Sequence, residues 1–142
     1  MKLQKLHIKN FKSIVDLEIV EPNPFTVFVG PNGSGKSNIF EALEFSNLLN
    51  RFSDSDSIVS MFGGLASITH FTYENHASEI VFITGKLTHI SRRVADSSIW
   101  EHWIKRPDDQ SFGPGEMMER EQSAQYLKKN FSRVFVNQLY KE

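Results

Sequence analysis

One run of residues combines glycines, a lysine and a hydroxyl at a spacing that suits phosphate binding. Glycines let successive backbone N–H groups turn inward around an anion, and a helix that starts directly afterwards adds the positive end of its dipole. Lys36 would bring an ammonium to the β and γ phosphates, and the Ser37 hydroxyl would be one ligand of a bridging Mg²⁺ ion. The run fits the pattern G-x-x-x-x-G-K-[ST] and consists of Gly30, Pro31, Asn32, Gly33, Ser34, Gly35, Lys36 and Ser37.

The segments on either side of this run are those that such a site needs. Residues 25–29 carry bulky side chains on both faces, which predicts a strand buried inside a sheet. In residues 37–50 the apolar side chains recur at helical spacing, which predicts a helix. The alternative is a glycine-rich turn with an incidental Lys-Ser pair. The strand-loop-helix context favours a site for ATP and Mg²⁺ over that alternative.

Alternating apolar and polar residues predict two strands ahead of the run, over 3–11 and 15–20, joined as a hairpin. The segments that follow are less regular. We predict strands over 68–73, 79–87, 99–104 and 133–137, a helix over 116–130, and exposed loops over 51–60 and 108–115.

Length and composition exclude several classes of protein. The 142 residues correspond to about one domain, and 16 basic against 17 acidic side chains leave a net charge of -1, which excludes a polybasic chain. The absence of cysteine excludes disulfides and thiolate zinc sites and fits a reducing compartment. No apolar run approaches the ~20 residues of a membrane span, and no export signal is recognisable at the N-terminus. We therefore expect a cytoplasmic protein with no membrane partner.

Two stretches resemble the N-terminal lobe of the SMC, RecF and RecN-type ATPases, the ATP-binding-cassette (ABC) ATPases of chromosome maintenance, DNA repair and anti-phage defence. They are I-K-N-F-K-S at residues 8–13 and G-P-N-G-S-G-K-S-N at residues 30–38. Residues 62–64 and 131–136 are also similar to stretches of the overcoming-lysogenization-defect ATPases. The resemblance implies an α/β fold, a P-loop NTPase in which residues 1–142 form the N-terminal lobe of an ABC-type head with an antiparallel β-subsheet.

The resemblance also implies roles for individual residues. In this family a glutamine after a strand beyond the first lobe's helical part touches the Mg²⁺ and the attacking water, and Gln138 matches it in order and context. The basic residue of the N-F-K-S turn can approach the phosphates, which makes Lys12 a candidate. A surface glutamine and a solvated turn lysine are the respective alternatives. The implied site thus joins Lys36 and Gln138 in catalysis, Ser37 and Gln138 at the metal, and Lys12 and residues 30–38 up to Asn38 at the nucleotide.

Other elements of a cassette ATPase do not occur in this sequence: a signature motif of the S-G-G type, an apolar strand ending in Asp-Glu, and a switch histidine. In the family they belong to a C-terminal lobe that follows a helical insertion, and the chain stops at Glu142, about where that insertion would begin. The resemblance therefore implies half of an ATPase head, from a truncated chain, the ordered part of a longer one, or one subunit of a split protein. Its expected partners are the missing lobe, a second head in a homodimer, and DNA or a nuclease or other effector, with negligible turnover by this chain alone.

Two other functions stay open. A small P-loop kinase acting on a metabolite would need an arginine-bearing lid, and the N-F-K-S hairpin argues against it. A non-catalytic regulatory subunit would bind nucleotide and recruit a partner. The five histidines show no metal-ligand spacing. The basic residues of the first strand, which would contact DNA or merely solvate an exposed face, are Lys2, Lys5, Lys9 and Lys12.

Overall fold

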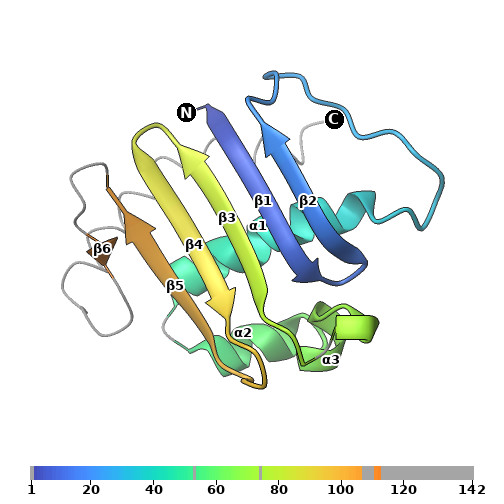
Figure 1. The fold of residues 1–142 in the computed structure, drawn as a ribbon, viewed down its shortest axis with the longest axis vertical. Coiled ribbons are helices and arrows are strands. Elements are labelled where there is room, and N and C mark those ends of the chain that lie inside the picture. The colour runs from blue at the N-terminus through green and yellow to red at the C-terminus, as the bar shows by residue number, and fades with distance from the viewer. Residues whose placement is uncertain (1, 53, 74, 107–110, 113–142) are drawn as a thin grey trace.

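The computed structural model describes residues 2–52, 54–73, 75–106 and 111–112. In this part of the chain, strands form an antiparallel six-stranded sheet in the order β2-β1-β3-β4-β5-β6, with the helix α1 lying across one face (Figure 1). The strands are β1 (Leu3–Phe11), β2 (Ile14–Val20), β3 (Ser78–Thr84), β4 (Leu87–Arg93), β5 (Trp100–Lys105) and β6 (Ser111–Phe112). The helices are α1 (Lys36–Arg51), α2 (Ser55–Met61), α3 (Leu65–Ile68) and the 3-10 turn η1 (Phe71–Tyr73).

Strands β1 and β2 form the hairpin that the sequence predicts. Phe11 pairs with Ile14, so the turn between them consists of Lys12 and Ser13. Lys12 has a positive φ of 51°, the left-handed conformation that tight hairpin turns use. On its other edge, β1 pairs antiparallel with β3, so the hairpin is part of the sheet and both predicted strands are confirmed.

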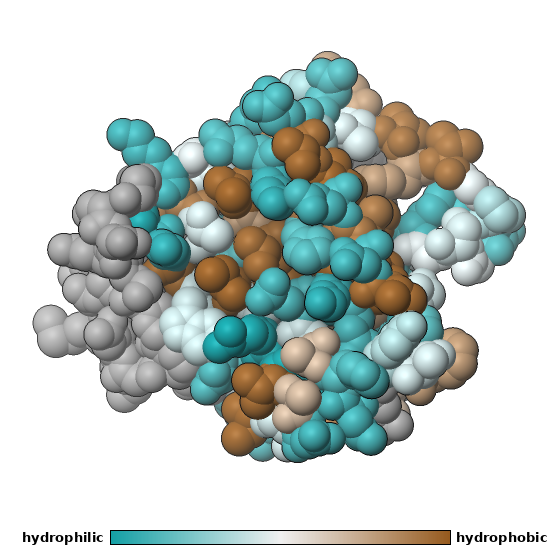
Figure 2. All heavy atoms as spheres, viewed as in Figure 1, coloured by the Kyte–Doolittle hydropathy of each residue, from teal (hydrophilic) through white to brown (hydrophobic). Residues whose placement is uncertain are grey.

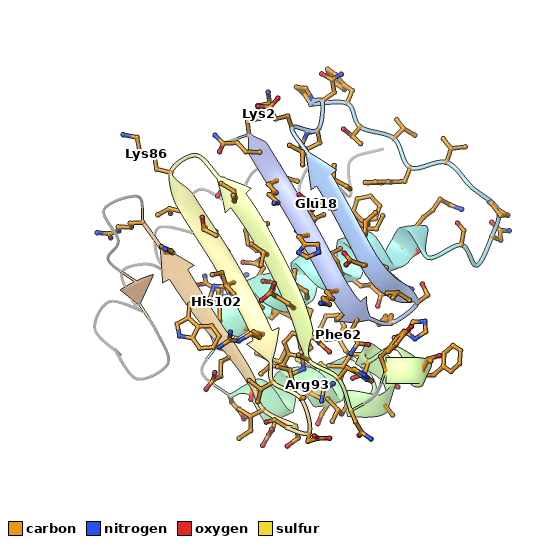
Figure 3. All side chains as sticks on the ribbon, in the orientation of Figure 1. Lys2, Glu18, Phe62, Lys86, Arg93 and His102 are labelled. Carbon is orange, nitrogen blue, oxygen red and sulfur yellow. The ribbon has the colours of Figure 1, made fainter. Side chains whose placement is uncertain are left out.

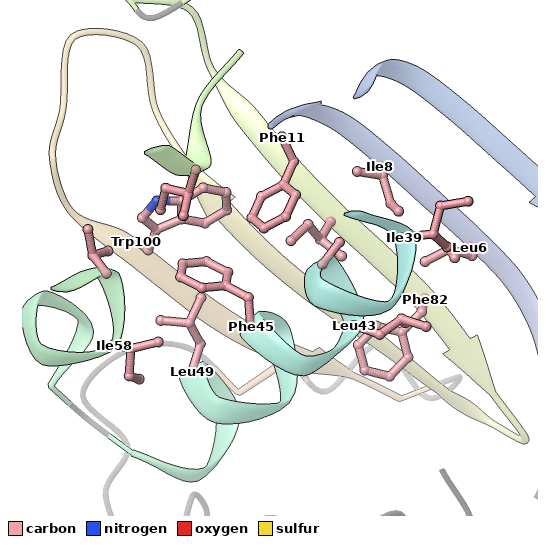
Figure 4. Packing of buried hydrophobic residues seen from close by; sticks show 14 of the residues in the cluster. Leu6, Ile8, Phe11, Ile39, Leu43, Phe45, Leu49, Ile58, Phe82 and Trp100 are labelled. Carbon is pink, nitrogen blue, oxygen red and sulfur yellow. The ribbon is translucent and has the colours of Figure 1, made fainter. Parts of the chain in front are cut away.

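The hydrophobic core lies between α1 and the sheet (Figure 4). At its centre, the ring centroid of Phe45 lies 5.6 Å from that of Phe11, 5.2 Å from that of Phe62 and 4.9 Å from that of Trp100. These tilted and edge-to-face arrangements are the ones that aromatic rings prefer. The predicted helix is confirmed, and the apolar residues that it buries are Ile39, Ala42, Leu43, Phe45 and Leu49.

The opposite face of the sheet mixes charged and apolar side chains, as Figure 2 shows. Lys5 Nζ lies 2.8 Å from Glu18 Oε1, and His7 Nε2 lies 2.7 Å from Asp16 Oδ1. Acidic groups of β2 therefore balance basic groups of β1. Of the four lysines named above, this balance applies to Lys5, for which it favours solvation of an exposed face over a contact with DNA.

Residues 25–29 do not form the predicted buried strand. They pair with no strand in the described part of the chain, and the backbone N–H of Thr26 closes a turn by donating to the carbonyl of Asn23 at 3.1 Å. Phe28 turns toward α1, where its ring meets that of Phe40 edge-on with the centroids 5.8 Å apart. The prediction is wrong for this structure because a buried strand needs neighbours to pair with and a layer to cover it. The exposed side chains are Phe25 at 92%, Val27 at 77% and Val29 at 90%.

Other boundaries also differ from the predictions. The predicted loop over 51–60 contains most of α2, whose N-terminus is capped by Asp54 accepting a hydrogen bond from the backbone N–H of Ser57 at 3.2 Å. The predicted strand over 68–73 is wrong, because the chain there ends α3 and forms η1.

The predicted strand over 79–87 is confirmed only as far as Thr84, where β3 ends, and the sequence did not reveal β4 after it. The strand expected over 99–104 is confirmed as β5. Within the loop expected over 108–115, residues 111–112 form β6. The remainder of that loop, the helix predicted over 116–130 and the strand predicted over 133–137 lie outside the described residues.

Candidate functional site

The glycine-rich loop joins the exposed segment 25–29 to the N-terminus of α1. Gly33 and Gly35 have φ values of +81° and +86°, a region that residues with a side chain adopt at a cost. The backbone N–H of Ser34 donates to the carbonyl of Pro31 at 3.2 Å, which closes a turn within the loop. The two glycines thus permit the curvature that a phosphate-binding loop requires.

The Lys36 side chain folds back over this loop. Its ammonium donates to the carbonyl oxygens of Gly30 at 2.5 Å and Pro31 at 2.7 Å, and it lies 3.3 Å from the hydroxyl oxygen of Ser34. These distances place the positive charge directly against the concave loop backbone. An anion bound at the loop would compete with these carbonyl oxygens for the ammonium and would form a charge-assisted hydrogen bond with it.

One N–H group in the first turn of α1 is already used, because the backbone N–H of Asn38 donates to the carbonyl of Gly35 at 3.0 Å. Among the described residues, no side chain caps this end with a hydrogen bond, and no acidic residue stands in the first turn. Such uncapped N–H groups and the helix dipole attract a phosphate. Ser37 is exposed in this turn, and its hydroxyl is the kind of hard oxygen ligand that Mg²⁺ takes beside phosphates. The residues present therefore fit a Mg²⁺-bound phosphate chain.

Asn38 and Ser13, which the sequence analysis did not connect, meet at the edge of this loop. The Asn38 side-chain amide donates to the hydroxyl oxygen of Ser13 at 2.7 Å. A Cβ on Gly35 would collide with the same hydroxyl. The sequence signal was present as two short motifs, N-F-K-S and G-K-S-N, but nothing in either motif shows that they touch.

Lys12 points to a different partner from the one the resemblance implies. Its ammonium forms an ion pair with the carboxylate of Glu41 on α1 and lies 5.9 Å from the ring centroid of Phe62. Figure 3 shows Phe62 near the end of the β1–β2 hairpin. A nucleotide contact by Lys12 stays a prediction, and Glu41 is a neighbour that the sequence analysis did not identify.

Gln138 lies outside the described residues, so its catalytic and metal-binding roles stay predictions. Within the part of the chain that the structure describes, no group of three or more His, Asp or Glu side chains could hold a metal ion. None of the described helices is both long enough and apolar enough to cross a membrane.

Comparison with known protein families gives a match that spans most of the chain. The family described as "AAA ATPase domain" matches residues 1–138 of the chain. The chain belongs to this family.

Relatives of this AAA ATPase domain include proteins of chromosome maintenance and repair. It is 33% identical over 114 residues to the chromosome partition protein Smc of Methanocaldococcus jannaschii, covering 72% of the chain and 9% of that protein. It is 39% identical over 61 residues to the DNA replication and repair protein RecF of Chlorobium phaeobacteroides, covering 41% of the chain and 17% of that protein. The resemblance to SMC and RecF ATPases is confirmed, and the chain matches less than a fifth of either relative.

Proposed function

We propose that this AAA ATPase domain binds Mg-ATP through residues 30–38 as the N-terminal lobe of an SMC/RecF-like ATPase head. Hydrolysis would be completed by a C-terminal lobe and by a second head across a nucleotide sandwich. The energy of the cycle would drive a conformational change that acts on DNA or on an effector, in chromosome maintenance, repair or anti-phage defence.

One observation carries the nucleotide part of this proposal: Lys36 and the loop glycines lie at the uncapped N-terminus of α1. Lys36 Nζ lies within 2.7 Å of the carbonyl oxygens of Gly30 and Pro31, and Lys36 is the first residue of a helix whose N-terminus has no side-chain cap. The ammonium and the positive end of the helix dipole therefore lie at the same end of α1, which suits the β and γ phosphates. Lys36 would act there by stabilising the negative charge of the transferred phosphoryl group.

The exposed segment before the loop supports the proposal that a second lobe packs against this one. Phe25, Val27 and Val29 present large apolar side chains to solvent within a few residues of the proposed site, and Figure 2 shows hydrophobic atoms along this segment. Burying such side chains is worth about 1.5 to 3 kcal/mol each. A further layer of the head packed over this segment would recover that energy and supply the neighbours that an unpaired segment lacks.

The experiment is calorimetric titration of the chain with Mg-ATP. Lys36→Ala should weaken binding by at least tenfold, because a charge-assisted hydrogen bond contributes about 1.5 to 3 kcal/mol. Lys86→Ala, which removes a lysine in the turn between β3 and β4, is the matched control and should bind as the wild type does. Equal affinity in the wild type and Lys36→Ala would show that the nucleotide does not bind at this loop.

A further inference from the structure

The hairpin turn of the sheet touches the phosphate-binding loop at its last glycine. The turn consists of Lys12 and Ser13, and it lies beside the N-terminal end of α1 (Figure 1). Asn38, in the first turn of α1, donates its side-chain amide to the Ser13 hydroxyl at 2.7 Å across 25 residues of sequence. This hydrogen bond links the sheet directly to the helix end that carries the phosphate-binding N–H groups.

The turn itself is held firmly from the opposite side. The backbone N–H of Lys12 donates to the carbonyl of Ile68 at 2.9 Å. Asn10, which is only 3% exposed, donates its side-chain amide to the carbonyl of Tyr73 at 2.8 Å and accepts from the N–H of His70 at 3.2 Å. These contacts fix the turn and the end of β1 to α3 and the segment after it, so the backbone that carries Ser13 is held in place.

A second contact lies one helical turn further along α1. Glu41 follows Asn38 by three residues, so the two side chains share a helix face. Glu41 pairs with Lys12, the neighbour of Ser13 in the turn. The turn therefore engages α1 at two successive points and restrains both the position and the rotation of its first turn.

Gly35 shows how closely the two segments fit. It has a φ of +86°, and a Cβ built on it would collide with the Ser13 hydroxyl oxygen, with the Asn38 amide nitrogen 3.7 Å away. The hydroxyl thus fills the space that a side chain at position 35 would need. Gly35 lies between the loop and α1, where its backbone sets the direction of the first N–H groups of the helix.

From these contacts we infer that Ser13 is a positioning residue for the nucleotide: from the hairpin turn, it holds Asn38 and the last glycine of the loop in place. This inference rests on the proposed function. Preorganised donors bind more tightly than donors that must be ordered at the moment of binding, because the ordering entropy opposes association. The Ser13–Asn38 hydrogen bond supplies this order before the nucleotide arrives.

Calorimetry with Mg-ATP on the whole chain tests the inference. Ser13→Ala and Asn38→Ala should each weaken binding about three- to tenfold, and the double variant should lose no more than the larger single loss, since both remove one hydrogen bond. The free energy of unfolding without nucleotide should change little, because Ser13 is exposed. A loss of stability with unchanged affinity would make the contact structural only. Loss of affinity in Asn38→Ala alone would show that Asn38 acts on the nucleotide itself, and either result would overturn the inference.

Ser67→Ala is the matched control. Ser67 is also exposed, donates one hydrogen bond to the carbonyl of Gly63 at 2.8 Å, and would meet a Cβ on that glycine, whose φ is +92°. This change should leave affinity unaltered. Failure of the proposed function gives a different result: the wild type and Lys36→Ala would then bind Mg-ATP with equal affinity. If only the present inference fails, Lys36→Ala still binds more weakly than the wild type, and Ser13→Ala binds with wild-type affinity.

A second test reverses the sign of the Ser13 effect. Gly35→Ala should weaken binding, both through its left-handed φ and through the collision with the hydroxyl. Adding Ser13→Ala removes the collision, so the double variant should bind Mg-ATP more tightly than Gly35→Ala alone, although Ser13→Ala by itself weakens binding. Additive losses in the double variant would overturn the inference.

Discussion

Phe45 and Trp100 meet edge to face where α1 crosses β5, with their ring centroids 4.9 Å apart and their planes inclined by 76°. Phe45 comes from α1, whose N-terminus is the proposed phosphate site, and Trp100 comes from β5 (Figure 4). Both are buried. This contact therefore ties the position of α1 to a part of the sheet remote from the loop.

Phe45→Ala should destabilise the chain by about 3 to 5 kcal/mol, because it removes a fully buried ring and leaves a cavity among Phe11, Phe62 and Trp100. Denaturant unfolding measures the change. Phe71→Ala is the matched control, since Phe71 is 88% exposed, and it should stay within about 0.5 kcal/mol. Similar losses for both variants would contradict the assigned core.

The spacing of apolar and polar residues predicted those strands and helices that have one apolar and one polar face. In β1, apolar Leu6 and Ile8 alternate with His7 and Lys9, and the structure buries the first pair under α1. The prediction of a buried strand over 25–29 failed because it used only the apolar residues of the segment. Burial also depends on a neighbouring strand and a covering layer. Phe28 finds part of that cover, because its ring meets that of Phe40 and it packs against the core cluster.

The candidate site was predictable in its chemistry but not in its neighbours. The spacing of Gly30, Gly35, Lys36 and Ser37 indicates phosphate binding by itself, because the loop and helix are contiguous in sequence. The contact between Ser13 and Asn38 depends on how the hairpin packs beside α1, which periodicity does not specify. For the same reason the sequence could not show that Lys12 pairs with Glu41.

Lys12 and Glu41 together test whether the turn lysine reaches the nucleotide. If it does, Lys12→Met should weaken Mg-ATP binding about tenfold, and by more than Glu41→Gln, which breaks the same ion pair but keeps the ammonium. Stability should change by less than about 1 kcal/mol in either variant, because the side chains are 20% and 36% exposed. Unchanged affinity in both variants would leave Lys12 with the ion pair alone.

His89 makes folding sensitive to acid. Burial lowers the pKa of His89 from 6.5 to about 4, so the folded state holds the neutral ring while the unfolded state takes up a proton below pH 6.5. Stability rises with pH wherever the unfolded state binds more protons, so the contribution is present above pH 6.5 and is lost as the pH falls toward 4. The loss over that window should be about 3 kcal/mol.

The slope of the free energy of unfolding against pH isolates this effect. His89→Gln should flatten the slope between pH 6.5 and 4, whatever its effect on absolute stability. Glu18 and Asp54, whose pKa values are lowered by Lys5 and Ser57 respectively, contribute acid sensitivity in both proteins and cancel in the comparison. His76→Gln, at an exposed histidine, is the control. An unchanged slope in His89→Gln would show that the ring is already protonated in the fold.

Gln138 is predicted to contact Mg²⁺ and the attacking water, a task that suits an uncharged amide because its oxygen can ligate a cation or accept from water. Gln138→Ala should therefore reduce ATP hydrolysis about a hundredfold in a head completed with a C-terminal lobe, by analogy with the loss of a group that positions a proton transfer. The free energy of unfolding, measured by thermal denaturation, should change by no more than about 0.5 kcal/mol. Asn137→Ala removes the neighbouring amide and serves as the control, with near-normal hydrolysis expected. Normal hydrolysis in Gln138→Ala would exclude the residue from the site, and an unfolded variant would assign it to the fold instead.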